Sequence, residues 1–132
     1  MNTSSKSAAS ILVVEDDGLI ALHNQQLLIK YGYQVPDMFA YGEEVLDYLE
    51  NGALPDLILM DIGLAGNLDG IETARQVIER HRIPVIFLTS YSDTNRIARA
   101  GEISPYGYIV KPVVEGDLIL QIREALGQPL VR

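Results

Sequence analysis

Cysteine is absent from this sequence of 132 residues. Neither a disulfide framework nor a thiolate metal site can therefore form. The lack of cysteine is compatible with the reducing environment of the cytoplasm, and that is where we expect the protein to act.

Basic residues are also few, because 10 Lys and Arg face 18 Asp and Glu and give a net charge of −8. Nonspecific binding to nucleic acid or to an anionic membrane needs basic patches, so we expect no direct contact with nucleic acid. No apolar run approaches the roughly 18 residues that cross a bilayer, so we expect no membrane insertion. Residues 1–10 are polar and serine-rich, lack the basic start and apolar centre of a secretion signal, and are interpreted as a flexible leader.

Short apolar runs followed by helical patterns make up the rest of the chain. The runs lie at 11–14, 35–39, 57–60, 85–88 and 108–110. The first, third and fourth are continuous, which is typical of strands buried on both faces of a parallel sheet. Helical spacing of apolar residues follows four of the runs, and a shorter helix is expected at about 93–100, with Arg96 and Arg99 on a solvated face.

Five strands alternating with five helices predict an α/β fold, a doubly wound five-stranded parallel sheet with helices on both faces. The flavodoxin-like strand order 2-1-3-4-5 would place the first and third strands at the topological switch point. We expect one domain over residues 11–127, followed by a short tail at 128–132. Functional sites of such sheets lie outside the carboxyl ends of the strands.

Polar residues stand directly after four of the five predicted strands. Glu15 and Asp16 follow the first strand, Asp61 the third, Thr89 the fourth and Lys111 the fifth. A polar residue after a single strand is ordinary, but four such ends on one edge of a sheet predict a site.

Carboxylates that converge at this edge repel one another. Two like charges about 4 Å apart repel by roughly 4 kcal/mol at an effective dielectric constant near 20, so the cluster needs a cation or raised pKa values. Ligands that are all oxygen favour a hard ion such as Mg²⁺, with Mn²⁺ as an alternative. A carboxylate beside Mg²⁺ can attack phosphorus and form an aspartyl phosphate, whose charge Lys111 and the Thr89 hydroxyl would stabilise.

Four segments carry a family resemblance: ILVVEDD at 11–17, LMDI at 59–62, PVIFLTS at 84–90 and YIVKP at 108–112. Together and in this order they resemble the receiver domains of two-component response regulators, over about residues 11–126. The resemblance implies that Asp61 accepts a phosphoryl group from a histidine kinase or a histidine phosphotransfer protein. It implies that Glu15, Asp16, Asp61 and the Gly63 carbonyl hold Mg²⁺.

The resemblance also implies a switch. Thr89 and Lys111 would bind the phosphoryl oxygens, and Thr89 with Tyr108 would change the face made by the fourth helix, fifth strand and fifth helix. That face would bind a downstream protein or a second copy of the chain. The Lys111–Pro112 peptide bond is expected to be cis.

Two features depart from the common receiver pattern. The loop at 63–70 is one residue longer and lacks the usual proline, and a large aromatic residue, Tyr91, stands two positions after Thr89. By resemblance, Gly63 and Tyr91 flank the path of the water that hydrolyses the phosphorylated state. Tyr91 would lengthen that state if its ring leaned over the pocket, whereas it would have no such effect if it packed against the fourth helix.

Two other functions are weighed against a phosphorylated switch. One is a binding module that keeps the fold without using the phosphate, although the chain retains Asp61, Thr89 and Lys111. The other is an aspartyl phosphatase like the haloacid dehalogenases, which carry a second Asp two residues after the nucleophile, where this chain has Gly63. We expect a protein that is not a conventional enzyme but assists its own phosphorylation and dephosphorylation.

Overall fold

The computed structural model describes residues 8–64 and 66–128. Its strands form one parallel sheet in the order β2-β1-β3-β4-β5, as predicted. The strands are β1 (Ile11–Val14), β2 (Met38–Phe39), β3 (Leu57–Asp61), β4 (Val85–Thr89) and β5 (Gly107–Val110). The helices are α1 (Gly18–Lys30), α2 (Gly42–Asn51), α3 (Gly70–His81), α4 (Thr94–Ala100) and α5 (Glu115–Ala125), with 3-10 turns η2 (Tyr91–Asp93) and η3 (Gly101–Ile103).

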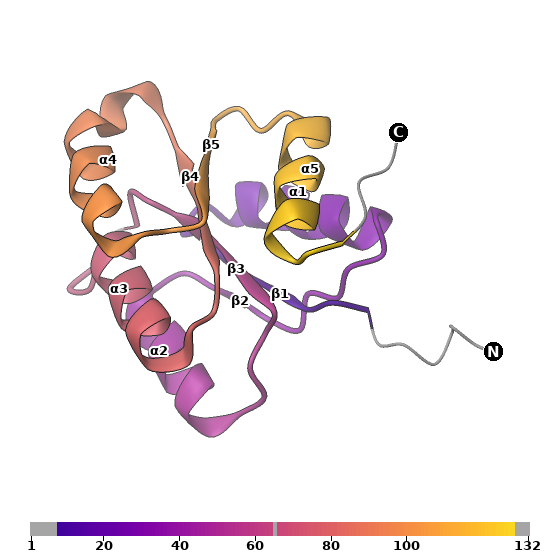
Figure 1. Ribbon diagram of the computed structural model, residues 1–132, viewed down its shortest axis with the longest axis horizontal. Helices are drawn as coiled ribbons and strands as arrows, with labels where there is room; N and C mark the ends of the chain where they lie inside the picture. The colour runs from indigo at the N-terminus through magenta and orange to yellow at the C-terminus, as the bar shows by residue number, and fades with distance from the viewer. Residues whose placement is uncertain (1–7, 65, 129–132) are drawn as a thin grey trace.

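The helices cover both faces of the sheet (Figure 1). Alternate side chains of each central strand point to opposite faces, so Leu12 and Val14 pack with α2, α3 and α4. Ile11 and Val13 instead pack with α1 and α5. The continuous apolar runs are therefore explained by burial on both faces. Residues 1–7 of the predicted leader and 129–132 of the predicted tail lie outside the described residues, so the proposed domain limits stay a prediction.

The second strand is shorter than predicted. The run at 35–39 reduces to Met38–Phe39, which pairs with Val13 and Val14, while Gln34 forms only an isolated bridge with Ser10. Pro36 explains the interruption, because proline has no N–H to donate to a ladder and its ring fixes φ. The strand lies at the edge of the sheet, where such an interruption is tolerated.

The segment after β4 contains a turn that was not predicted. The fourth helix, Thr94–Ala100, agrees with the predicted helix at about 93–100, and the turn η2 precedes it. The carboxylate of Asp93 accepts hydrogen bonds from the Ser90 backbone N–H (2.7 Å) and hydroxyl (3.1 Å). The Asp93 N–H donates in turn to the Ser90 carbonyl oxygen at 3.0 Å, so hydrogen bonds in both directions cap this turn. The cap directs the chain away from the sheet immediately after Thr89.

The loop after β3 returns closely onto the strand that it leaves. Asp69 accepts a hydrogen bond from the Glu72 N–H at 2.8 Å and caps α3. Gly70, the first residue of α3, is fully packed: a Cβ built on it would lie 2.5 Å from the Asp61 carbonyl oxygen. The first residue of α3 therefore packs so closely against the backbone of Asp61, the last residue of β3, that no side chain fits between them.

Candidate functional site

Three carboxylates meet at the carboxyl ends of β1 and β3. Because Val14 pairs with Met60, the residues that follow them, Glu15 and Asp61, lie side by side. Glu15, Asp16 and Asp61 each offer one oxygen within 4.8 Å of the other two. Glu15 and Asp61 are buried, at 4% and 7% exposure, whereas Asp16 is exposed. The structure thus brings together the three acidic side chains that the sequence singled out.

The charged form of this cluster is unfavourable. Burial and the nearby charge of Asp61 raise the pKa of Glu15 to about 7, against the opposing effects of the Asp17 N–H and the Lys111 ammonium. No histidine belongs to this three-residue group, so its donors are all oxygen. Such a donor set fits a hard divalent cation, and Mg²⁺ characteristically uses a small number of carboxylates together with water and phosphate oxygens.

Lys111 lies against the acidic cluster. Its Nζ is 3.4 Å from Glu15 Oε1 and 3.4 Å from Asp61 Oδ1. Burial alone would lower the pKa of the Lys111 ammonium, but the charges of Asp61 and Glu15 outweigh it and raise that pKa. The backbone also fixes the residue, since the Lys111 N–H donates to the Thr89 carbonyl at 2.7 Å. The following Lys111–Pro112 bond is cis, as predicted.

Thr89 and Gly63 lie at the same edge of the sheet. Thr89 is 1% exposed, and its hydroxyl lies 3.2 Å from the Ser90 carbonyl oxygen and 3.3 Å from Asp93 Oδ2. The Gly63 N–H donates to Asp61 Oδ1 at 3.0 Å. Gly63 therefore contacts the site through its backbone, while its carbonyl as a metal ligand stays a prediction.

Tyr91 and Tyr108 line a groove that shares Lys111 with the acidic site. The Tyr108 ring stacks on Phe87 in the neighbouring strand, with ring centroids 6.1 Å apart. Tyr91 is 88% exposed and lines a groove to which Tyr108 and Lys111 also contribute. At that exposure the ring of Tyr91 has little packing against α4, and its effect on hydrolysis stays a prediction.

The sequence did not single out Asp93, whereas Arg96 and Arg99 are exposed, as the sequence predicted. Asp93 is only 7% exposed, and its Oδ1 accepts a hydrogen bond from Arg96 Nη1 at 2.8 Å. Arg99, on the same helix, forms a surface ion pair with Asp69 at 3.2 Å. The Ser-x-x-Asp pattern at 90–93 is the signal that could have indicated the buried cap.

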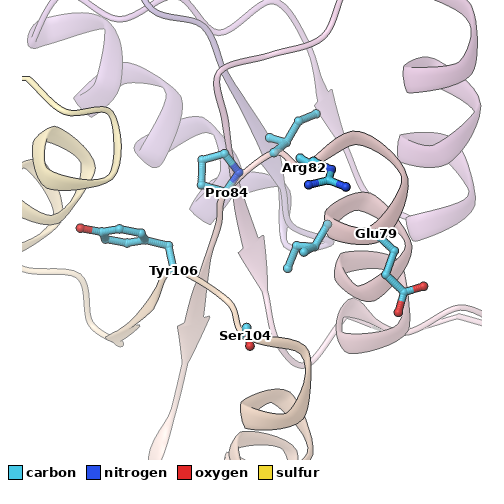
Figure 2. Close-up of a pocket in the computed structure, with 7 residues that line it drawn as sticks. Glu79, Arg82, Pro84, Ser104 and Tyr106 are labelled. Carbon is cyan, nitrogen blue, oxygen red and sulfur yellow. The ribbon is translucent and has the colours of Figure 1, made fainter.

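A second hollow lies at the amino ends of the strands, away from the acidic cluster at their carboxyl ends (Figure 2). It is lined by Ile78, Glu79, Arg82, Ile83, Pro84, Ser104 and Tyr106. Pro84 directly precedes β4 and Tyr106 directly precedes β5, so this hollow lies at the amino ends of the strands. Among these lining residues Glu79 alone carries a carboxylate, whereas the convergent charges lie at the carboxyl ends.

The comparison with protein families agrees with this geometry. The model of the response regulator receiver domain matches residues 11–123. The chain belongs to this family. The receiver domain is 30% identical over 118 residues to the transcriptional regulatory protein PdtaR of Mycobacterium tuberculosis, covering 89% of this chain and 57% of PdtaR. It is 37% identical over 114 residues to the transcriptional regulatory protein DltR of Streptococcus agalactiae, covering 86% of this chain and 50% of DltR.

Solved structures give the same result. The signal receiver domain of a modulated diguanylate cyclase from Desulfovibrio desulfuricans G20 superposes with a TM-score of 0.85 at 37% identity, covering 91% of this chain and 94% of that one. The chain spans about half the length of the curated relatives named above. Among the residues that the structure describes, none of the helices has both the length and the apolar character to span a bilayer.

Proposed function

We propose that this receiver domain accepts a phosphoryl group on Asp61 from a histidine kinase or a histidine phosphotransfer protein, in a reaction that requires Mg²⁺. One observation carries the proposal: the Asp61 carboxylate lies within 4.8 Å of two other carboxylates and 3.4 Å from the Lys111 ammonium. A divalent cation and a fixed lysine beside one carboxylate supply what phosphoryl transfer to that carboxylate needs.

The contacts of Asp61 favour one of its oxygens as the nucleophile. Oδ1 accepts from the Gly63 N–H and pairs with Lys111, which orients the carboxylate plane. With Oδ1 held by these two contacts, Oδ2 is the oxygen that attacks in the proposed reaction. The Oδ2–P bond forms while the bond from phosphorus to the donor's nitrogen breaks, and the donor imidazole keeps that electron pair.

The other site residues stabilise the transferred group. Mg²⁺, or Mn²⁺ in its place, would be held by Glu15, Asp16, Asp61 and the Gly63 carbonyl, and it neutralises charge on the phosphoryl oxygens when bound. The Lys111 ammonium adds a second cation. Thr89 donates its hydroxyl to a phosphoryl oxygen, which requires that hydroxyl to leave its present neighbours.

The motion of Thr89 is the start of the proposed switch. Thr89 pairs in register with Val110, and Tyr108 lies two residues earlier on the same strand. When Thr89 moves toward the phosphoryl group, the space that it vacates lets Tyr108 turn inward and reshapes the face made by α4, β5 and α5. Phosphorylation then shifts populations in favour of binding a downstream protein or a second copy of the chain.

Incubation with acetyl phosphate and Mg²⁺, followed by intact mass spectrometry, tests this function. We expect one phosphoryl adduct, located at Asp61 by peptide mapping and abolished by EDTA. Steady turnover of small phosphoesters without an adduct would instead indicate a phosphatase. A folded chain that takes no phosphate would indicate a phosphorylation-independent binding module.

Removal of one proposed metal ligand gives a sharper test. Asp16→Asn is expected to raise the Kd for Mg²⁺ by at least about tenfold, a change that needs only about 1.4 kcal/mol of lost interaction. The metal-free variant should be as stable as the wild type or more stable, because one repulsive charge is gone. Calorimetry and urea unfolding measure the two effects.

Asp17→Asn is the matched control for this change. Asp17 is the adjacent exposed carboxylate, it caps α1 through the Leu19 N–H at 3.0 Å, and it lies outside the three-residue group. Asn caps helices about as well as Asp, so the control should keep both its fold and its Mg²⁺ affinity. Equal losses of Mg²⁺ affinity in the two variants would refute the assignment of Asp16.

Gly63 and Tyr91 are proposed to set the lifetime of the phosphorylated state. Gly63 has no side chain to block or orient the attacking water, and the exposed Tyr91 lines the same groove as Lys111. Tyr91→Ala should therefore speed the loss of phosphate measured with Mg²⁺ present, and Tyr91→Glu should speed it too. An equal or slower loss in Tyr91→Ala would mean that the ring does not shield the site.

A further inference from the structure

Asp93 lies shortly after β4, and its buried carboxylate accepts hydrogen bonds from several donors. Its Oδ2 accepts from the Ser90 N–H at 2.7 Å and lies 3.3 Å from the Thr89 hydroxyl. Its Oδ1 accepts from Arg96 Nη1 at 2.8 Å. Two of these donors, the Thr89 hydroxyl and the Arg96 guanidinium, are groups that also bind phosphate well.

This carboxylate lies beside the proposed phosphoacceptor. A Cβ built on Gly63 would lie 3.7 Å from Asp61 Oδ1, 3.7 Å from Asp93 Oδ1 and 3.9 Å from Arg96 Nη1. The space that a side chain would fill at residue 63 is therefore bordered by the phosphoacceptor on one side and by the Asp93–Arg96 ion pair on the other. Because residue 63 is glycine, no side chain separates the two.

Asp93 is an anion in this setting. Burial opposes its ionisation, but the hydrogen bonds from Ser90, Arg96 and Thr89 together hold the pKa of the Asp93 carboxyl below its usual range. Arg96 is half exposed and is attached by a long, rotatable side chain. Its guanidinium can therefore change partner while its backbone in α4 stays in place.

We propose that Asp93 is a built-in competitor of the phosphoryl group: it holds the Thr89 hydroxyl and the Arg96 guanidinium in the unphosphorylated domain, and both donors transfer to phosphoryl oxygens when Asp61 is phosphorylated. The inference rests on the proposed phosphorylation of Asp61. A phosphoryl group carries more charge than a carboxylate and offers three strong acceptor oxygens, so it outcompetes Asp93 for the same donors. Asp93 thereby determines how strongly the phosphoryl group must bind these donors to switch the domain, and Arg96 is a further cation of the phosphorylated site beside Mg²⁺ and Lys111.

Two substitutions are expected to change the affinity for a phosphoryl mimic in opposite directions. Asp93→Asn removes the competing charge and keeps an oxygen that can accept from the Ser90 N–H, so the turn η2 should still form. It should tighten the binding of a phosphoryl mimic. Arg96→Gln removes a cation that the bound mimic would attract and should weaken that binding. A purely structural role of the ion pair would make both variants change binding in the same direction.

The experiment titrates the full chain, in the presence of Mg²⁺, with beryllium fluoride as a noncovalent mimic of the phosphoryl group. Binding is followed by the amide NMR signals of Thr89 and Tyr108. We expect about fivefold tighter binding in Asp93→Asn and about fivefold weaker binding in Arg96→Gln, the lower end of ordinary coupling between sites. In the double variant, Asp93→Asn should tighten binding less than it does alone, because one of the two contested donors is gone.

Arg99→Gln is the matched control, since Arg99 lies on the same helix and pairs with Asp69 rather than with Asp93. Its affinity for beryllium fluoride should equal that of the wild type. Unchanged or weaker binding in Asp93→Asn, or unchanged binding in Arg96→Gln, would overturn the inference while the wild-type chain still binds the mimic. A wild-type chain that neither binds the mimic nor accepts phosphate would overturn the proposed function, and the inference with it.

Discussion

Asp61→Asn is expected to reduce phosphoryl labelling by acetyl phosphate to background. The amide has the shape of the carboxylate but lacks the anionic oxygen that attacks phosphorus, and it loses the 3.4 Å ion pair with Lys111. The measurement is intact mass after incubation with acetyl phosphate and Mg²⁺. Asp17→Asn, which changes a neighbouring carboxylate outside the cluster, should keep wild-type labelling. Wild-type labelling in Asp61→Asn would mean that another residue is the acceptor.

The same variant has a second readout in the metal-free protein. Because the charge of Asp61 helps to raise the pKa of Glu15 from 4.5 to about 7, the folded wild type binds a proton on Glu15 that the unfolded chain releases between those pH values. This contribution to stability is present below pH 4.5 and is lost as the pH rises through about 7. Asp61→Asn lowers the pKa of Glu15, so urea unfolding should show a smaller loss of stability over that range.

Gly70→Ala is expected to destabilise the fold by about 3 kcal/mol, at the upper end of ordinary overpacking. The added Cβ would meet the Asp61 carbonyl oxygen at 2.5 Å and the Ile62 carbonyl oxygen at 3.3 Å, and backbone atoms at the end of a central strand cannot move aside as a flexible side chain can. Urea unfolding measures the change. Because the displaced backbone carries the phosphoacceptor, the rate of phosphorylation should fall as well.

Gly18→Ala is the control for this change. Gly18 is likewise the first residue of a helix, but a Cβ built there meets nothing within 4 Å. Alanine is the better helix former by up to about 1 kcal/mol, so the control should be neutral or slightly stabilising. If Gly70→Ala proved as stable as Gly18→Ala, the close approach of α3 to β3 would be wrong.

Much of the fold could be predicted because its elements have regular periods. The continuous runs that became β1, β3 and β4 are buried on both faces, and the polar residues after them meet because parallel strands end at one edge. The second strand was predicted too long, since a count of apolar residues at 35–39 ignores the missing N–H of Pro36. Edge strands are specified by their ladder partners as well as by their own residues.

The Asp93–Arg96 pair could not be predicted in the same way. A single Asp four residues after Thr89 has no period, and a charged residue on a short helix is usually solvated. The burial of Asp93 depends on η2 turning the chain back at Ser90, and the open space between Asp93 and Asp61 depends on the absence of a side chain at Gly63. The turn has a local signal in the Ser-x-x-Asp pattern at 90–93, but the second condition joins segments thirty residues apart, about which local sequence carries little information.

The hydrogen bond from the Lys111 N–H to the Thr89 carbonyl has a thermodynamic consequence for partners. It couples the two residues that would bind the phosphoryl group through the backbones of adjacent strands, and Lys111 leads directly into the loop before α5. A protein that binds this loop more tightly when the domain is phosphorylated must, by linkage, increase the affinity of the site for a phosphoryl mimic by the same factor. Binding of the phosphoryl group and binding of the partner are then coupled, and measuring either affinity gives the same coupling free energy.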